Sequence, residues 1–352
     1  MNPAAWAGRR VFVTGHTGFK GAWLAMILSE AGAEVHGYAL APPTEPSCFA
    51  CCRVAELLAA HHVADVRDLD RLGRAMRDAR PDAVFHLAAQ ALVRRSYQDP
   101  IETYATNVMG TANVLDAVRQ VGGVRAVVSV TSDKCYENLE RDEPYRESDA
   151  MGGHDPYSSS KGCAELVTSS YARSFLRPAG VRVASARAGN VIGGGDWAED
   201  RLVPDLLRAT ASGNALAVRS PDATRPWQHV LEPISGYLRL AERMLENDPV
   251  AEGAWNFGPS ADDIRPVRWV LDRMCARLPG ARWERGPTPA LHEARLLALD
   301  SGKAQRELGW HPAWMLDRAI EETAAWYLAH ARGEDMRQFS LEQARRHRAS
   351  VP

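Results

Sequence analysis

The fold is decided by the segment Arg10–Gly21, which reads RVFVTGHTGFKG. It begins with an apolar run of strand length that stops at Gly15. Glycines follow at positions 18 and 21, and an amphipathic stretch then continues to Gly32. The pattern predicts a strand, a glycine turn and a helix, whose closely approaching backbone and free N–H groups suit a phosphate. The spacing Gly-x-x-Gly-x-x-Gly differs from the commoner Gly-x-Gly-x-x-Gly, and an ordinary strand–helix turn has the same pattern in isolation.

Strands and helices alternate outward from this segment. Apolar runs predict further strands at 35–40, 62–65, 83–88, 126–130 and 181–186, and helical patterns lie between most of them, including 68–79, 99–121 and 157–176. This order is typical of an α/β protein with a Rossmann-type doubly wound parallel sheet. Ligands bind beyond the carboxyl ends of such strands, so one crevice should contain Gly15, Asp65, Ala88 and Ser132.

The sequence pattern changes after about Arg187, where Pro, Trp and Arg are interleaved with helical stretches. We expect residues 1–188 to form the Rossmann domain and residues 189–330 to form a smaller mixed α/β substrate domain. The second domain is discontinuous, since segments near 229–258 should return to the first. The last residues, 331–352, are highly charged and predict a loosely attached tail.

Composition narrows the classes of partner and the compartment. A net charge of -2 over 352 residues gives no electrostatic reason to expect nucleic acid or an anionic membrane. No apolar run reaches the roughly 18 residues of a membrane span, and a signal-peptide pattern is missing from the N-terminal stretch. We therefore expect a cytoplasmic protein.

The six cysteines do not predict a disulfide framework in a long chain without an export signal. Cys48, Cys51 and Cys52 precede His61 and His62. Their spacing matches no regular zinc pattern, so we expect a loop with free thiols and no metal site.

The segment from Thr131 to Lys161 carries the candidate chemistry. Tyr157 and Lys161 are four residues apart and share one face of a helix. A phenol with a pKa near 10 is a poor base, but a nearby ammonium and a cationic nicotinamide both favour the phenolate. Tyr-x-x-x-Lys pairs are common by chance, and this one gains weight from its place after the glycine turn and the fifth predicted strand. Ser132 can donate a hydrogen bond to the same substrate oxygen.

Asp133 and Lys134 add an acid and a potential base beside Ser132. An enzyme that only transfers a hydride needs neither Asp133 nor Lys134, so the pair indicates an additional reaction step. Cys135, the next residue, should face the other side of the strand and be structural. The second predicted strand ends in Ala39-Leu40-Ala41, without an acid or an arginine, and so does not choose between NAD and NADP.

Six features of the sequence carry a family resemblance. The glycine turn, the Tyr157/Lys161 pair and the segment 107–111 (NVMGT) resemble the extended short-chain dehydrogenase/reductase family. Within that family, residues 131–136 (TSDKCY), 187–197 (RAGNVIGGGDW) and 225–230 (RPWQHV) resemble the nucleotide-sugar 4,6-dehydratases that act on CDP-glucose. The resemblance covers roughly residues 8–330. It implies bound NAD, CDP-glucose as substrate, and a CDP-4-keto-6-deoxyglucose product that serves deoxysugar and surface polysaccharide synthesis.

The resemblance also implies a role for each matching residue. The implied catalytic residues are Ser132, Asp133, Lys134, Tyr157 and Lys161. Contacts to NAD are implied for Gly15, Thr17, Gly18, Phe19, Gly21, Asp65, Val66, Leu87, Ala88, Ala89, Asn107, Tyr157 and Lys161, with Asp65 and Val66 at the adenine. Contacts to the nucleotide sugar are implied for Ser132, Asn190, Arg201, Arg219, Arg225, His292 and Arg295, and arginines of this kind can grip a diphosphate bidentately.

One departure is informative. The related dTDP-glucose dehydratases carry Asp-Glu where this chain has Asp133-Lys134, and their Glu is the base for carbon 5. Lys134 can replace it only as a neutral amine, which requires a lowered pKa. We expect Asp133 to act as acid toward the departing hydroxyl, and Lys134 as base or electrostatic helper.

Two rival functions remain open, and the oligomer is a further expectation. A nucleotide-sugar 4-epimerase needs Ser132, Tyr157 and Lys161 but not the Asp133–Lys134 pair, and a non-catalytic nucleotide-binding protein needs none of them. The segments 99–121 and 157–176 resemble helices that pair as a four-helix bundle in dimers of this family, so we expect a homodimer or higher oligomer. One buried face would contain Val108, Ala112, Leu115 and Val118, although burial within the monomer explains the same pattern.

Overall fold

A computed structural model describes residues 2–287 and 296–351 of the chain. At its centre is a seven-stranded sheet with the order β11-β6-β5-β4-β1-β2-β3, in which every neighbouring pair is parallel. Its strands are β1 (Arg10–Thr14), β2 (Glu34–Ala39), β3 (Ala60–Val63), β4 (Ala83–His86), β5 (Ala126–Val130), β6 (Arg182–Ala188) and β11 (Gly253–Phe257). The predicted doubly wound parallel sheet is confirmed.

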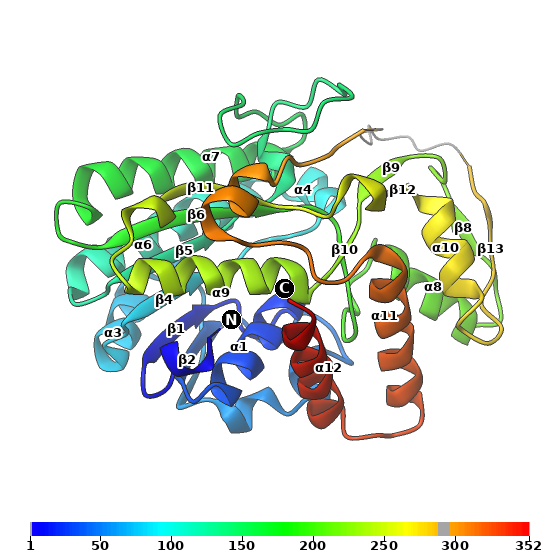
Figure 1. The fold of residues 1–352 in the computed structure, drawn as a ribbon, viewed down its shortest axis with the longest axis horizontal. Coiled ribbons are helices and arrows are strands. Elements are labelled where there is room, and N and C mark those ends of the chain that lie inside the picture. The colour runs from blue at the N-terminus through cyan, green and yellow to red at the C-terminus, as the bar shows by residue number, and fades with distance from the viewer. Residues whose placement is uncertain (1, 288–295, 352) are drawn as a thin grey trace.

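The alternation of side chains along β1 explains why helices cover both faces of the sheet. Val11 and Val13 join one buried apolar cluster, whereas Phe12 joins another on the opposite face. The first cluster packs against α1 (Phe19–Glu30) and α9 (Leu231–Leu245), and the second against α3 (Leu69–Ala79) and α6 (Gly110–Val121). Figure 1 shows α9 lying across one face of the sheet.

The remaining elements complete the chain. The helices are α2 (Cys48–Cys51), α4 (Val93–Gln98), α5 (Pro100–Tyr104), α7 (Pro156–Tyr171), α8 (Leu202–Ala211), α10 (Val267–Cys275), α11 (Leu316–Ala331) and α12 (Met336–Ser350). The short strands are β7 (Val191–Ile192), β8 (Leu216–Val218), β9 (Thr224–Pro226), β10 (Gln228–His229), β12 (Ile264–Pro266) and β13 (Trp283–Arg285). They form the pairs β10–β7, β12–β9 and β13–β8. In Figure 1, α8, α10 and the β8–β13 pair gather at one end of the molecule.

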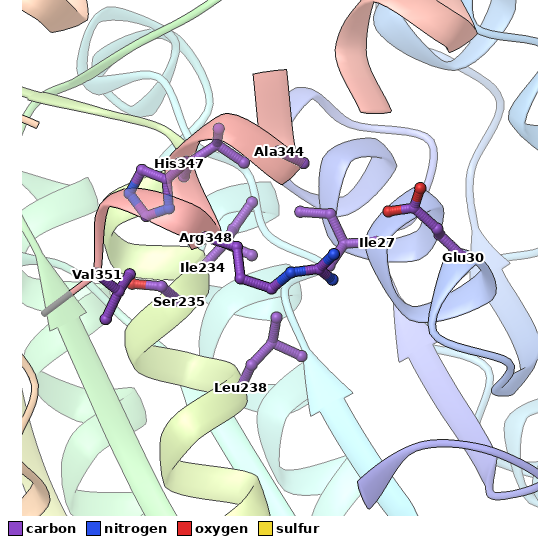
Figure 2. A pocket seen from close by; sticks show the side chains of 10 residues that line it. Ile27, Glu30, Ile234, Ser235, Leu238, Ala344, His347, Arg348 and Val351 are labelled. Carbon is purple, nitrogen blue, oxygen red and sulfur yellow. The ribbon is translucent and has the colours of Figure 1, made fainter. Parts of the chain in front are cut away.

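The C-terminal segment corrects the expectation of a loosely attached tail. Residues Met336–Ser350 form α12, and a stripe at helical spacing is buried: Met336, Ser340, Gln343 and His347. Figure 2 shows side chains of α12 beside those of α1 and α9. His347 Nε2 lies 2.9 Å from Glu232 Oε1, and Arg345 Nε donates to Glu30 Oε1 at 2.7 Å. The charges that suggested a tail belong largely to the outer side of a docked helix.

Candidate functional site

A cavity of about 1090 Å³ opens at the carboxyl ends of the central strands. Gly15, Asp65, Ala88 and Ser132, which follow four different strands, all line it. Parallel strands end at the same edge of a sheet, so the topology gathers residues that are far apart in the chain. The cavity is large enough for a dinucleotide and a second ligand, since single ligand pockets span about 300–1,000 Å³.

The glycine turn is packed so tightly that only glycine fits at two of its positions. Gly15 has a φ of +76°, and a Cβ there would lie 2.6 Å from the backbone nitrogen of Ala88. A Cβ on Gly21 would lie 2.1 Å from the carbonyl oxygen of Gly15. The first turn of α1 is thereby pressed against the end of β1, with its free N–H groups next to the cavity. This cradle fits the diphosphate of a dinucleotide.

The ends of β2 and β3 form the side of the cavity that the resemblance assigns to adenosine. Thr17 Oγ1 donates to the Leu40 carbonyl oxygen at 2.9 Å, which ties the glycine turn to the end of β2. Asp65 and Val66 line the cavity, and Asp65 also accepts hydrogen bonds from Arg67 at 2.6 and 2.9 Å. The Asp65 carboxylate in the cavity is therefore already paired with the Arg67 guanidinium.

Asn107 is the one described residue of the implied cofactor set that does not line the cavity. Its side chain is buried, donating to the Gln90 carbonyl oxygen at 3.0 Å and to Ser160 Oγ at 2.8 Å. Its own oxygen accepts from the Gln90 backbone N–H at 2.8 Å. Asn107 thus holds the loop after β4 against α7 and acts on the site through that loop.

The end of β5 brings three polar side chains into the cavity. Ser132 Oγ donates to Asp133 Oδ1 at 2.9 Å and accepts from the Lys134 backbone N–H at 3.2 Å. Lys134 Nζ lies 3.9 Å from Asp133 Oδ1. Asp133 Oδ2 is buried with no hydrogen-bond partner in the described structure. A buried carboxylate oxygen left unpaired in this way is available to a ligand hydroxyl.

Tyr157 and Lys161 occupy successive turns at the start of α7, and both line the cavity. Burial raises the pKa of the Tyr157 phenol, whereas Arg201 and a hydrogen bond with Ser132 lower it. Burial also lowers the pKa of Lys161 to about 8, partly offset by Glu165. At neutral pH the site therefore holds a phenol beside an ammonium, and a further positive charge is needed to release the proton.

A buried ionic network lies directly behind this reaction centre. Glu165 accepts hydrogen bonds from Arg187 at 2.8 Å and from Ser185 at 2.6 Å, and it also accepts one from Thr131. Arg187 donates to Tyr136 Oη at 2.6 Å. Thr131 precedes Ser132, so the network fixes the strand end that carries the polar residues. Cys135 is buried beside Tyr136 in a separate apolar cluster, and it does not line the cavity.

The far side of the cavity carries the residues implied for the substrate. Asn190, Arg201, Arg219 and Arg225 line it. Arg201 donates to the Ala91 carbonyl oxygen at 3.1 Å, which links this side to the loop after β4. The expected His292 and Arg295 lie outside the described residues.

Several cavity residues escaped the sequence reasoning. They are Lys20, Arg94, Tyr97, Asp196 and Trp197. Arg94 pairs with Asp200 at 3.0 Å, and Trp197 Nε1 is buried without a partner in the described structure. Arg94 and Tyr97 lie on α4, a few residues after the fourth predicted strand, and their proximity to that strand end was the available signal. Asp196 and Trp197 stand in the segment 187–197, which carried part of the family resemblance, but neither residue was assigned a role in the site.

The residues Cys48, Cys51, Cys52, His61 and His62, all within the described part of the chain, form no metal centre. No group of three or more His, Cys, Asp or Glu side chains there is placed to hold a metal ion. All six cysteines are free thiols. His61 instead contacts His16 of the glycine turn, with 2.7 Å between Nδ1 and Nε2. No helix among the described residues is both long and apolar enough to span a membrane.

Comparison with known proteins gives a consistent group of relatives. Residues 11–258 match the model of the NAD dependent epimerase/dehydratase family. A CDP-glucose 4,6-dehydratase from Salmonella typhimurium is 51% identical over 337 residues, covering 94% of each chain. A dTDP-glucose 4,6-dehydratase from Neisseria gonorrhoeae is 27% identical, covering 76% of this chain and 81% of the relative. The solved structure of a dTDP-glucose 4,6-dehydratase from Streptomyces venezuelae, with NAD bound, superposes with a TM-score of 0.76 at 26% identity and covers 92% of this chain and 98% of that one.

Proposed function

The chain belongs to the NAD-dependent epimerase/dehydratase family, and from that premise we propose that it is a CDP-glucose 4,6-dehydratase. It converts CDP-D-glucose to CDP-4-dehydro-6-deoxy-D-glucose and water, with NAD as the cofactor. The observation that carries the proposal is the placement of Asp133 and Lys134 beside Ser132 in a cavity that also contains Tyr157 and Lys161. The 51% identity to a CDP-glucose 4,6-dehydratase supports the nucleotide.

The residues of the cradle fit NAD. The N-terminal turn of α1 would hold the diphosphate, Asp65 and Val66 would meet the adenine, and Lys161 would hold the ribose of the nicotinamide. No acid stands at the end of β2, where Leu40 is 57% exposed, so the preference for NAD follows from the family and not from that position. When bound, NAD would supply the acceptor for a hydride from carbon 4 of the sugar and the donor of that hydride to carbon 6.

Tyr157 removes the proton of the 4-hydroxyl. In the described structure it is buried, and the pKa raised by burial keeps it protonated until a cation arrives. Lys161 and the oxidised cofactor supply that positive charge. Ser132 currently donates to Asp133 and turns its hydroxyl to the sugar oxygen during the reaction.

Asp133 and Lys134 carry out the elimination. Formation of the 4-ketone acidifies the proton on carbon 5, and Lys134 is the residue that removes it. Lys134 gives this proton back to carbon 5 when the hydride returns to carbon 6. Asp133 delivers a proton to the hydroxyl that leaves carbon 6 as water, through its unpaired Oδ2. One base and one acid on the same strand end thus serve adjacent carbons of one sugar.

The nucleotide sugar enters from the side of the cavity opposite the glycine turn. Arg201, Arg219 and Arg225 bind its diphosphate, and Asn190 contacts the sugar. His292 and Arg295 keep their proposed role at the substrate. This arrangement supports a division of labour in which residues 1–188 bind NAD and the larger part of residues 189–330 binds the nucleotide sugar.

We further propose a homodimer built on α5, α6 and α7. Leu115 and Val118 pack against the sheet within the monomer, so they do not form the interface. Exposed apolar side chains on or beside these helices support the interface instead: Ile101 is 76% exposed, Met109 56% and Leu166 61%. The free thiols of all six cysteines support a reducing compartment, the cytoplasm.

Incubation with CDP-, dTDP- and GDP-linked glucose or mannose tests the function. The expected result is release of a 4-keto-6-deoxy sugar, detected by its alkaline absorbance, from CDP-glucose in preference to the others. Recovery of CDP-galactose would instead identify a 4-epimerase, the activity of several solved relatives of this fold. Binding of NAD without turnover of any nucleotide sugar would identify a binding protein.

A further inference from the structure

An ion pair crosses the rim of the cavity between two parts of the chain that the proposed function assigns to different ligands. Arg94 belongs to α4, on the cofactor side, and Asp200 shortly precedes α8, on the substrate side. Arg94 Nη1 and Asp200 Oδ1 are 3.0 Å apart. Both side chains line the cavity, yet they are 37% and 36% exposed, so the pair lies where the cavity meets solvent.

A second contact joins the same two segments. Arg201, the residue after Asp200, donates from Nη2 to the Ala91 carbonyl oxygen at 3.1 Å. Ala91 stands three residues before Arg94, so two adjacent residues on the substrate side are tied to one short segment on the cofactor side. Residues 200–201 therefore form a bridging segment across the rim.

The backbone of Asp200 is held in a conformation that most residues avoid. Its φ is +57°, in the left-handed region, which aspartate and asparagine adopt more readily than other residues with a side chain. Such a conformation costs free energy and persists where surrounding contacts fix it. The ion pair with Arg94 supplies such a contact, and α8 begins two residues later, at Leu202.

The bridging segment also determines where the Arg201 side chain lies. Arg201 lines the cavity and reaches toward the reaction centre: burial raises the pKa of the Tyr157 phenol, and Arg201 is the first group that opposes this shift. The residue before Arg201 is anchored by Arg94. Movement of Asp200 would therefore move the guanidinium that is proposed to bind the diphosphate of the nucleotide sugar.

We propose that Arg94 and Asp200 are positioning residues, whose ion pair closes the rim over the bound nucleotide and holds Arg201 at its diphosphate. The proposal deepens the proposed function and rests on it for the nucleotide. The pair has to open before the ligand can leave, so its main effect is on the rate of release. A closed rim also limits the entry of water during the reaction.

Binding of CDP to the full-length protein in the presence of NAD tests this proposal, because CDP carries the diphosphate but no sugar that can react. Stopped flow gives the rate of release, and isothermal titration gives the affinity. Arg94→Met removes one charge, and Asp200→Asn removes the other while it tolerates the same backbone conformation. Each variant should release CDP about fivefold faster, near the upper limit for a partly exposed ion pair. The rate of association should change little.

Further variants show whether the two residues act as one unit. The double variant Arg94→Met/Asp200→Asn should release CDP no faster than either single variant, because both substitutions remove the same contact. Arg94→Lys retains a cation and should restore much of the slow release. Arg95→Met is the matched control on α4: Arg95 pairs with Glu102 of α5 at 2.7 Å, and that pair does not cross the rim. This control should release CDP at the rate of the unsubstituted protein.

The rival explanation is that Arg94 binds the ligand directly. Asp200→Asn would then free the guanidinium and strengthen CDP binding, opposite to the effect of Arg94→Met, and this pattern would overturn the proposal. Additive effects in the double variant, or unchanged release in both single variants, would overturn it as well. Failure of the unsubstituted protein to bind CDP would remove the proposed function too, whereas normal binding with unchanged variants removes only the role of the pair. Thermal unfolding of each variant establishes that the fold is retained.

Discussion

Lys134 Nζ lies 3.9 Å from Asp133 Oδ1, while Oδ2 of the same carboxylate is buried without a partner in the described structure. The two side chains differ in access, since Asp133 is 2% exposed and Lys134 29%. A buried acid thus lies beside a more exposed amine at one strand end. This relationship distinguishes the site from one that transfers only a hydride.

Lys134→Met should stop dehydration and spare the oxidation at carbon 4. Loss of a general base slows its step by about 10²–10⁴-fold. A single turnover with CDP-glucose should therefore show the near-ultraviolet absorbance of reduced nicotinamide without release of the 4-keto-6-deoxy product. The carbon-5 hydrogen should also no longer exchange with deuterated solvent, an exchange that NMR can monitor. Normal dehydration by this variant would exclude Lys134 as the base, whatever the behaviour of Lys134→Arg.

Tyr157→Phe should abolish turnover while NAD remains bound. The substitution removes only a hydroxyl, and the aromatic ring continues to fill its buried place on α7. We expect a loss of about 10²–10⁴-fold in the rate of carbon-4 oxidation, with the affinity for NAD changed by less than about twofold. Isothermal titration with NAD measures the second quantity. Activity close to that of the unsubstituted protein would contradict the assignment of Tyr157.

Gly21→Ala should destroy NAD binding, because its Cβ would lie 2.1 Å from the Gly15 carbonyl oxygen. The backbone of the turn must move to accept it, and the cradle for the diphosphate is lost. Gly73→Ala in α3 is the matched control, since its Cβ meets only the end of the Arg77 side chain at 3.4 Å. That control should retain NAD affinity and gain up to about 1 kcal/mol in stability. Equal NAD affinity in both variants would mean that the turn does not hold the cofactor.

Leu166→Glu should convert a dimer to a monomer. Leu166 is 61% exposed on α7, and a charge there would have to be buried in the proposed interface. Light scattering coupled to size exclusion gives the mass of the particle. Val250→Glu, at an exposed apolar residue outside α5, α6 and α7, should leave the mass unchanged. A monomer before any substitution, or a dimer that persists in Leu166→Glu, would place any interface elsewhere.

The sequence predicted the sheet well because its signals are local. The run Ala126–Val130 is strand β5 with the same bounds, since a largely apolar segment of this length is buried on both faces. The topology of the sheet alone was enough to predict that residues at strand ends, such as Gly15 and Ser132, line one cavity. The place of Asn107 outside the cavity was not predicted, because the family motif fixes its position in the chain but not the direction of its side chain. The docking of α12 was also missed, since a sparse buried stripe is hidden by a high density of surface charge.

Lys20 shows a different limit of sequence reasoning. It stands inside the glycine turn, where the glycines attracted the interpretation and the lysine between them carried no strand or helix signal. Its side chain contacts Tyr237, which is more than two hundred residues away in the chain. That contact is not encoded locally. Long-range contacts between side chains are the information that the fold adds.

The Glu165–Arg187 pair provides a stability prediction with a defined dependence on pH. Both side chains are at most 5% exposed, and their contact is 2.8 Å long. Burial alone would raise the pKa of Glu165, but Arg187 and the hydroxyls of Ser185 and Thr131 outweigh it and hold this pKa below its usual value of 4.5. A carboxyl whose pKa is lowered by folding contributes stability above its unfolded pKa, and that contribution is lost as the pH falls through the folded pKa.

Glu165→Gln should therefore destabilise the protein most at neutral pH, by about 3–5 kcal/mol, because Arg187 remains buried without its partner charge. As the pH falls below 4.5, the unsubstituted protein loses the same interaction, so the difference in free energy of unfolding should shrink. Urea unfolding of both proteins at a series of pH values measures that difference. Glu102→Gln removes a partly exposed ion pair with Arg95 and should cost less than about 1 kcal/mol at every pH. A difference for Glu165→Gln that stays constant down to acidic pH would show that the pair is not the source of the stabilisation.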